Sequence, residues 1–316
     1  MILAGLVLLF FGGEGLIKGA VSLAHNFKLS KLLVSTVIVG FGTSMPEMTV
    51  SIGAALRDAP DIAVGNVVGS NICNILLIIG IAAILTPIAV SGIAVKRDAI
   101  VMIIASLILC GLGAVGVISA LSGAIMFGLL LAYIGWSYQQ DKKASIANTT
   151  AEHIEEDVAG TTDLKPLIAM LYSLAGLGTL IGGAYILVEG AVSIARGFGI
   201  SEAVIGLTIV AVGTSLPELA TSVVAALRKH SDVIIGNIVG SNIFNILAIL
   251  GITAMISPIQ ISAQIASIDV WIMLGVAVFL SIYLLRGITI GRISGILFLA
   301  AYIAYTAWLY LYGAQV

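Results

Sequence analysis

Two glutamates stand inside long apolar stretches of this sequence, each at the end of the same six-residue motif. Residues 42–47 read Gly-Thr-Ser-Met-Pro-Glu, and residues 213–218 read Gly-Thr-Ser-Leu-Pro-Glu. A charged side chain in the middle of a membrane helix costs about 2.5–3.5 kcal/mol on insertion scales, and it persists where it faces a cavity or a partner. The apolar stretches 33–56, 61–86, 202–227 and 233–257 carry no lysine or arginine, and Lys18, the one nearby basic residue, has Glu189 instead of a basic residue at its repeat position. The simplest partner for Glu47 and Glu218 is therefore a bound cation.

Oxygen-bearing groups surround each glutamate in the sequence. The preceding proline has no N–H and opens its helical turn, which frees backbone carbonyl oxygens where only a protein wall or a wet cavity tolerates them. Hydroxyl residues three and four positions before each glutamate share its helix face: Thr43 and Ser44 in one motif, Thr214 and Ser215 in the other. In each half, the next apolar stretch carries a polar residue at every fourth position, which forms a polar stripe along one helix face. The stripe consists of Asn66, Ser70 and Asn74 in the first half and of Asn237, Ser241 and Asn245 in the second.

The chemical type of these oxygen groups indicates which ions the site would bind. Carboxylate, amide, hydroxyl and carbonyl groups form the hard, flexible set of about six to eight ligands that calcium takes. Two negative charges balance one calcium or two sodium ions, so competitive binding and exchange of the two species are electrostatically natural. Transition metals are disfavoured, because all three histidines fall in expected loops and no Cys-His cluster exists. The alternatives are protonated structural glutamates and hydrogen bonding between helices by the polar stripes. Asn71 and Asn242 lie off these stripes, which favours a structural role for them.

The composition places these residues in a membrane. Of 316 residues, 60% are hydrophobic and 9% are charged, and the mean hydropathy is +1.17. Soluble domains carry about 25% charged residues, so a soluble enzyme is excluded. The net charge of -2 gives no reason to expect a nucleic-acid partner. The opening apolar run lacks a basic leader and is expected to be a retained helix.

Apolar runs of spanning length predict an all-α integral membrane protein with ten transmembrane helices. Residues 139–165 are predicted to be a polar cytoplasmic linker between a first five-helix unit, 1–138, and a second, 166–316. The ten expected spans are residues 1–23, 33–56, 61–86, 98–117, 119–138, 166–189, 202–227, 233–257, 267–285 and 293–312.

An internal repeat relates the two units. Shifted by 171 positions, residues 42–80 match residues 213–251 at 23 of 39 positions without a gap. Five helices are an odd number, so the second unit must enter the membrane from the opposite side. The units are therefore predicted to be inverted repeats, an arrangement common in secondary transporters.

Basic residues set the expected orientation. With the N-terminus outside, eleven lysines and arginines near helix ends fall on the cytoplasmic side, and only Arg57 and Arg196 fall outside. We expect a multi-pass protein of the cell membrane with both ends of the chain outside.

The paired Gly-Thr-Ser-x-Pro-Glu and Gly-Asn-x-x-Gly-Ser-Asn-x-x-Asn segments resemble the two alpha repeats of the calcium/cation antiporter superfamily, especially its prokaryotic sodium/calcium exchanger-like members. The resemblance covers both halves. It implies a cluster of ion sites around Glu47, Glu218, Asn74 and Asn245. Backbone carbonyls of Thr43 and Thr214 and further ligands from Ser44, Ser70, Ser215 and Ser241 complete the set that it implies.

One position departs from part of that superfamily. Some relatives, including potassium-dependent exchangers, carry Asp where this chain has Asn245, so no potassium requirement is expected. The predicted function is an electrogenic antiporter that exchanges sodium for calcium by alternating access. It needs no cofactor beyond the transported ions, and a monomer suffices. A calcium/proton antiporter is the main alternative, followed by a passive cation channel and, last, an intramembrane hydrolase.

Overall fold

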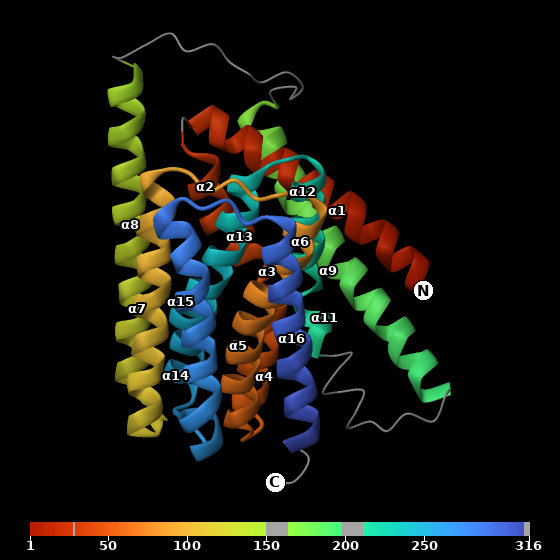
Figure 1. Ribbon diagram of the computed structural model, residues 1–316, viewed down its shortest axis with the longest axis vertical. Coiled ribbons are helices and arrows are strands. Elements are labelled where there is room, and N and C mark those ends of the chain that lie inside the picture. Colours follow the sequence, from red (N-terminus) through yellow and green to blue (C-terminus); the bar gives the residue numbers. More distant parts are fainter. Residues whose placement is uncertain (28, 150–163, 198–210, 313–316) are drawn as a thin grey trace.

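The computed structural model describes residues 1–27, 29–149, 164–197 and 211–312. Helices make up nearly all of this part of the chain (Figure 1). In the first half they are α1 (Ile2–Phe27), α2 (Lys31–Val34), η1 (Ser35–Val39), α3 (Gly40–Thr43), α4 (Met45–Ala55), α5 (Pro60–Cys73), η2 (Asn74–Ile78), α6 (Ile79–Leu85), α7 (Ile93–Val115) and α8 (Ala120–Thr149). In the second half they are α9 (Pro166–Gly197), α11 (Ala211–Thr214), α12 (Leu216–Leu227), α13 (Ser231–Phe244), η4 (Asn245–Leu250), α14 (Gly251–Ile256), η5 (Ile265–Asp269), α15 (Val270–Arg286) and α16 (Arg292–Tyr312). Two short strands, β1 (Val117–Ile118) and β2 (Ile259–Gln260), pair antiparallel.

Within the described residues, eight helices are long and apolar enough to cross a bilayer, and the bent pair formed by residues 31–43 and 45–55 raises the number to nine. The remaining expected span, 202–227, lies partly outside the described residues. The fifth span differs from expectation, because α8 continues to Thr149, past the expected end at residue 138. Residues 139–149 contain no glycine or proline, so nothing in the local sequence stops the helix where its apolar stretch ends.

The two helices α1 and α9 pack together at close range, and both are tilted relative to the other long helices, which run vertically in Figure 1. Glycines permit this approach. A Cβ atom added at Gly12 would lie 2.7 Å from the backbone nitrogen of Leu180, and one at Gly183 would lie 2.9 Å from the backbone nitrogen of Leu9. Five buried residues of α1 and three of α9 form, together with Val34 and Val39, a hydrophobic cluster that is separate from the larger core cluster.

Both prolines of the repeated motif stand at helix breaks, as predicted. The helix that ends at Thr43 bends by 45° into α4, and Ser44 at the break has φ -83° and ψ 7°. Ser215 stands at the corresponding break between α11 and α12 with φ -86° and ψ 7°. Pro46 and Pro217 occupy the first turn of the helix that follows, where a missing N–H leaves no hydrogen bond unmade.

The polar stripes lie on the two central helices, α5 and α13. Every residue of α13 from Val233 to Phe244 is buried. In both halves the helix widens into a π-helical segment that begins at the last asparagine of the stripe, Asn74 for η2 and Asn245 for η4. Such π segments are frequent at functional sites, and the sequence pattern did not predict them.

Candidate cation site

The two glutamates meet across the repeat. Glu47 and Glu218 lie in the first turns of α4 and α12, and each is 1% exposed. The hydroxyl of Ser215 donates to Oε1 of Glu47 at 3.1 Å, and the hydroxyl of Ser44 donates to Oε1 of Glu218 at 3.0 Å. Each carboxylate is therefore held by the serine at the helix break of the other half, so the two breaks come together at one place.

Four buried oxygens at this place have no hydrogen-bond partner among the described residues. They are Oε2 of Glu47, Oε2 of Glu218, Oδ1 of Asn74 and Oδ1 of Asn245. The π segment η2, which begins at Asn74, packs against α12, and η4, which begins at Asn245, packs against α4. A buried acceptor left unsatisfied costs about 1–3 kcal/mol, and more when it is charged. Four unsatisfied acceptors on elements that pack together, two of them on acidic groups, are suited to a cation.

The side-chain nitrogens of the two asparagines are already occupied. Nδ2 of Asn74 donates to Oδ1 of Asn242 at 3.1 Å, and Nδ2 of Asn245 donates to Oδ1 of Asn71 at 2.9 Å. These bonds leave the oxygen of each amide as the group that remains for a ligand. Asn71 and Asn242 thus have the supporting role that their position off the stripe indicates. The Asn-x-x-Asn spacing recurs in both halves, but each bond joins one half to the other, so the spacing within a half does not predict which asparagines pair.

Asn66 and Asn237, which the stripe suggests as ion ligands, have a different role. Nδ2 of Asn66 donates to the carbonyl oxygen of Glu47 at 3.1 Å and to the hydroxyl of Ser51 at 3.0 Å. Asn237 donates to the carbonyl oxygen of Glu218 at 3.3 Å. Both amides therefore tie the glutamate-bearing helix to the central helix beside it.

The hydroxyl groups of Thr43 and Ser241 make hydrogen bonds close to Glu218. The Thr43 hydroxyl donates to Oδ1 of Asn237 at 3.2 Å. The Ser241 hydroxyl donates to the carbonyl oxygen of Gly40 at 3.1 Å and approaches Oε1 of Glu218 at 3.5 Å. Nine of the ten expected site residues are buried, and Thr214 is partly exposed; the nine are Thr43, Ser44, Glu47, Ser70, Asn74, Ser215, Glu218, Ser241 and Asn245.

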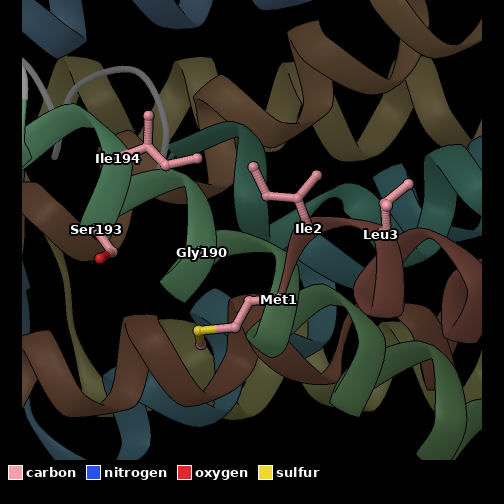
Figure 2. A pocket seen from close by; sticks show the side chains of 6 residues that line it. All are labelled: Met1, Ile2, Leu3, Gly190, Ser193 and Ile194. Atoms are coloured by element: carbon pink, nitrogen blue, oxygen red, sulfur yellow. The ribbon is translucent and has the colours of Figure 1, made fainter.

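A separate cavity of about 400 Å³ opens between α1 and α9. Figure 2 shows the residues that line it, which carry almost only apolar groups: Met1, Ile2, Leu3, Gly190, Ser193 and Ile194. None of them belongs to the cluster around the glutamates. This cavity is therefore not the cation site.

The comparison with known families agrees with this geometry. The family model described as "Sodium/calcium exchanger protein" matches residues 1–139 and 168–311. The chain belongs to the sodium/calcium exchanger family. It is 38% identical to the putative antiporter CaxA of Alkalimonas amylolytica over 96% of each chain. It is 29% identical to the sodium/calcium exchanger MaX1 of Methanosarcina acetivorans, over 98% of this chain and 97% of the other.

Solved structures of the sodium-calcium exchanger NCX_Mj superimpose on this exchanger. One of them, soaked with Na+ and Sr2+, matches with a TM-score of 0.82 and 30% identity, over 97% of this chain and 96% of the other. The chain is thus a multi-pass membrane antiporter of this family and not an enzyme, and sodium and calcium ions are its transported substrates.

Charged residues on α1 have local partners in this exchanger. The Glu14 carboxylate accepts two hydrogen bonds from Arg228, which follows the last turn of α12, at 2.9 and 2.8 Å. This pair raises the pKa of the Arg228 guanidinium above its ordinary value. The Lys18 ammonium lies 5.2 Å from the centre of the Tyr172 ring on α9. Both charges of α1 are thus paired locally, Glu14 with Arg228 and Lys18 with the Tyr172 ring.

Proposed function

We propose that this chain exchanges sodium for calcium at one shared site between α4, α5, α12 and α13, which opens to the two sides of the membrane in turn. The observation that carries the proposal is the set of four unpartnered buried oxygens of Glu47, Glu218, Asn74 and Asn245. In this proposal the transported cation satisfies all four. Without a cation, the two carboxylates lie in a region of low dielectric, where their charges are strongly unfavourable.

The two carboxylates set the charge balance of the site. One calcium or two sodium ions neutralise them, so each species displaces the other. The two asparagine oxygens and the nearby hydroxyl groups of Ser44 and Ser215 add neutral ligands, which suit both ions. Exchange of one calcium for three or more sodium ions moves net charge, and we propose that transport is electrogenic in this way.

The matching bonds support an inverted repeat. The Ser44 to Glu218 bond maps onto the Ser215 to Glu47 bond under the 171-residue shift, and the bond from Asn74 maps onto the bond from Asn245. Together with the odd number of helices expected in each half, this supports ten transmembrane helices in two inverted five-helix units. We place the N-terminus outside the cell membrane, on the distribution of lysine and arginine. A monomer contains the complete site.

Calcium flux in reconstituted vesicles tests this function. An outward sodium gradient is expected to drive calcium uptake, and E47Q or E218Q is expected to abolish it, because either change removes one of the two balancing charges. The control is E189Q, which removes an exposed carboxylate of α9 and should leave the flux intact. Near-normal flux in E47Q or E218Q would contradict the site assignment.

Separate gradients distinguish the counter-ion. Sodium, potassium and proton gradients are imposed one at a time on the same vesicles. Uptake driven by sodium alone supports the proposal, whereas uptake driven by a pH gradient in sodium-free buffer would identify a calcium/proton antiporter. Dependence on co-transported potassium would contradict the potassium-independent mechanism that Asn245 favours. Reversal of the flux by an imposed membrane potential tests electrogenicity.

A further inference from the structure

One contact joins the end of α8 to the helix that carries part of the cation site. Oδ2 of Asp141 accepts a hydrogen bond of 2.6 Å from the backbone nitrogen of Ser30, and Oδ1 accepts one of 3.1 Å from the Ser30 hydroxyl. That hydroxyl also caps the helix by accepting from the backbone nitrogen of Leu33 at 3.1 Å. Residues 31–43, here called the arm, begin at this cap. An acidic group at a helix N-terminus is stabilised by the free N–H groups and the helix dipole.

The arm is pressed closely against the central helix α13. A Cβ atom added at Gly236 would lie 2.8 Å from the carbonyl oxygen of Leu32, and one added at Gly240 would lie 2.5 Å from the carbonyl oxygen of Thr36. The arm then ends at Thr43, directly before the break that carries Ser44. One end of the arm therefore lies at the cation site, and the other lies at the Asp141 contact. Between them the arm and α13 leave no room for an added methyl group.

Asp141 continues a buried face of α8. Tyr133, Ser137 and Asp141 recur every four residues and share one face of α8. The Arg97 guanidinium of α7 lies 6.0 Å from the Tyr133 ring and 5.9 Å from the Trp136 ring, and it bonds Asp98 at 2.6 Å. Tyr133 and Ser137 are buried, so this face of α8 lies against the rest of the molecule up to the turn before Asp141. The carboxylate can thus act as a fixed anchor for the arm.

The sequence repeat shows that this anchor carboxylate is present in one half only. In this last part of each half the repeat is offset by 172 positions instead of 171. This shift aligns Ser122-Gly123 with Ser294-Gly295, and it aligns Tyr133 with Tyr305 and Trp136 with Trp308. The same shift aligns Asp141 with Gly313, which has no side-chain acceptor. The sequence of the second half therefore offers no carboxylate at the position equivalent to Asp141.

We propose that Asp141 is a positioning residue for transport: it holds the arm closed on α13 and so disfavours opening of the cation site toward the membrane face at which α8 ends. This inference rests on the proposed function, because it assigns to Asp141 the balance between the two access states of that site. Loss of the anchor increases the fraction of molecules open toward the α8 face. The apparent affinity for an ion scales with the fraction that is open to it.

Sided transport kinetics test this assignment. D141A is expected to lower the KM for calcium about three- to tenfold on the α8 face and to raise it on the opposite face, measured in right-side-out and inverted membrane vesicles. D141N, which keeps an acceptor but loses the charge, should give smaller shifts with the same signs. The matched control K142A changes the next, exposed residue of α8 and should move neither KM. KM values that stay at those of the parent on both faces, or shifts with the same sign, would overturn the proposal.

Hydrogen exchange separates this proposal from the transport function. In the purified protein, D141N should speed exchange of the backbone amides of residues 31–36 and leave those of α4 unchanged. Parent vesicles without sodium-driven calcium flux would refute the proposed function, while the exchange result still reports on the anchor. Unchanged exchange in the arm would overturn the anchor even if the parent protein transports calcium.

Discussion

Asn71 holds the amide of Asn245 across the repeat, with 2.9 Å between Oδ1 of Asn71 and Nδ2 of Asn245. This bond fixes which atom of the Asn245 amide is left for a cation. The Asn71 side chain is also held in place, because its Nδ2 donates to the carbonyl oxygen of Asn242 at 3.2 Å. In the proposed site, Asn71 thus orients a ligand of the ion without contacting the ion itself.

Removal of this support is expected to weaken calcium binding. In N71A the Asn245 amide loses the acceptor that orients it and can turn its nitrogen toward the ion. Loss of such a supporting bond typically costs about 10- to 100-fold in metal affinity. Calcium binding to the purified protein measures the change, and the effect should fall on affinity while the amount of folded protein stays near that of the parent. Unchanged affinity in N71A would show that the Asn245 oxygen does not contact the ion.

A third carboxylate at the site should favour calcium over sodium. N245D replaces a neutral oxygen ligand by a charged one, and only one ion at a time can contact this position, where a calcium ion is attracted twice as strongly as a single sodium ion. The expected result is tighter calcium binding with slower sodium-driven release. Competition of sodium against bound calcium measures it, as the sodium concentration that displaces half of the calcium should rise. N245L, which keeps the approximate size but has no oxygen, should change calcium affinity in the opposite direction.

The sequence alone predicts the spans and the two glutamates, because both depend on local pattern. Apolar runs set the helices, and a charge within such a run needs a partner. The bond between Asn71 and Asn245 depends instead on how closely two helices approach, which no local pattern encodes. The role of Asn66 could not be predicted for the same reason. Its position on the stripe suggests an ion ligand, but its amide donates to the carbonyl oxygen of Glu47 and to the hydroxyl of Ser51.

His230, which occupies the N-cap position of α13 without a side-chain hydrogen bond to the helix, is expected to make stability depend on pH. Partial burial lowers its pKa below the ordinary value, and the charges of Lys31 and Arg228 act in the same direction. The unfolded chain therefore takes up a proton at a higher pH than the folded protein does, so stability falls as the pH drops through the ordinary histidine range. The drop in Tm between about pH 8 and about pH 5.5 should be smaller in H230N, because asparagine cannot protonate there and still favours a helix start. An equal drop in both proteins would exclude this residue as a cause.

A methyl group at Gly240 should force the arm away from α13. The added Cβ would lie 2.5 Å from the carbonyl oxygen and 2.8 Å from the Cα atom of Thr36, and backbone atoms cannot move aside as a side chain can. Overpacking of this kind costs about 1–3 kcal/mol, so G240A should lower the Tm and the sodium-driven calcium flux together. The control is G128A on α8, where no described atom lies within 4 Å of the added group and alanine is the better helix former by about 1 kcal/mol. G128A should therefore keep or raise the Tm. A G240A protein as stable and as active as G128A would show that the arm does not need its close contact with α13.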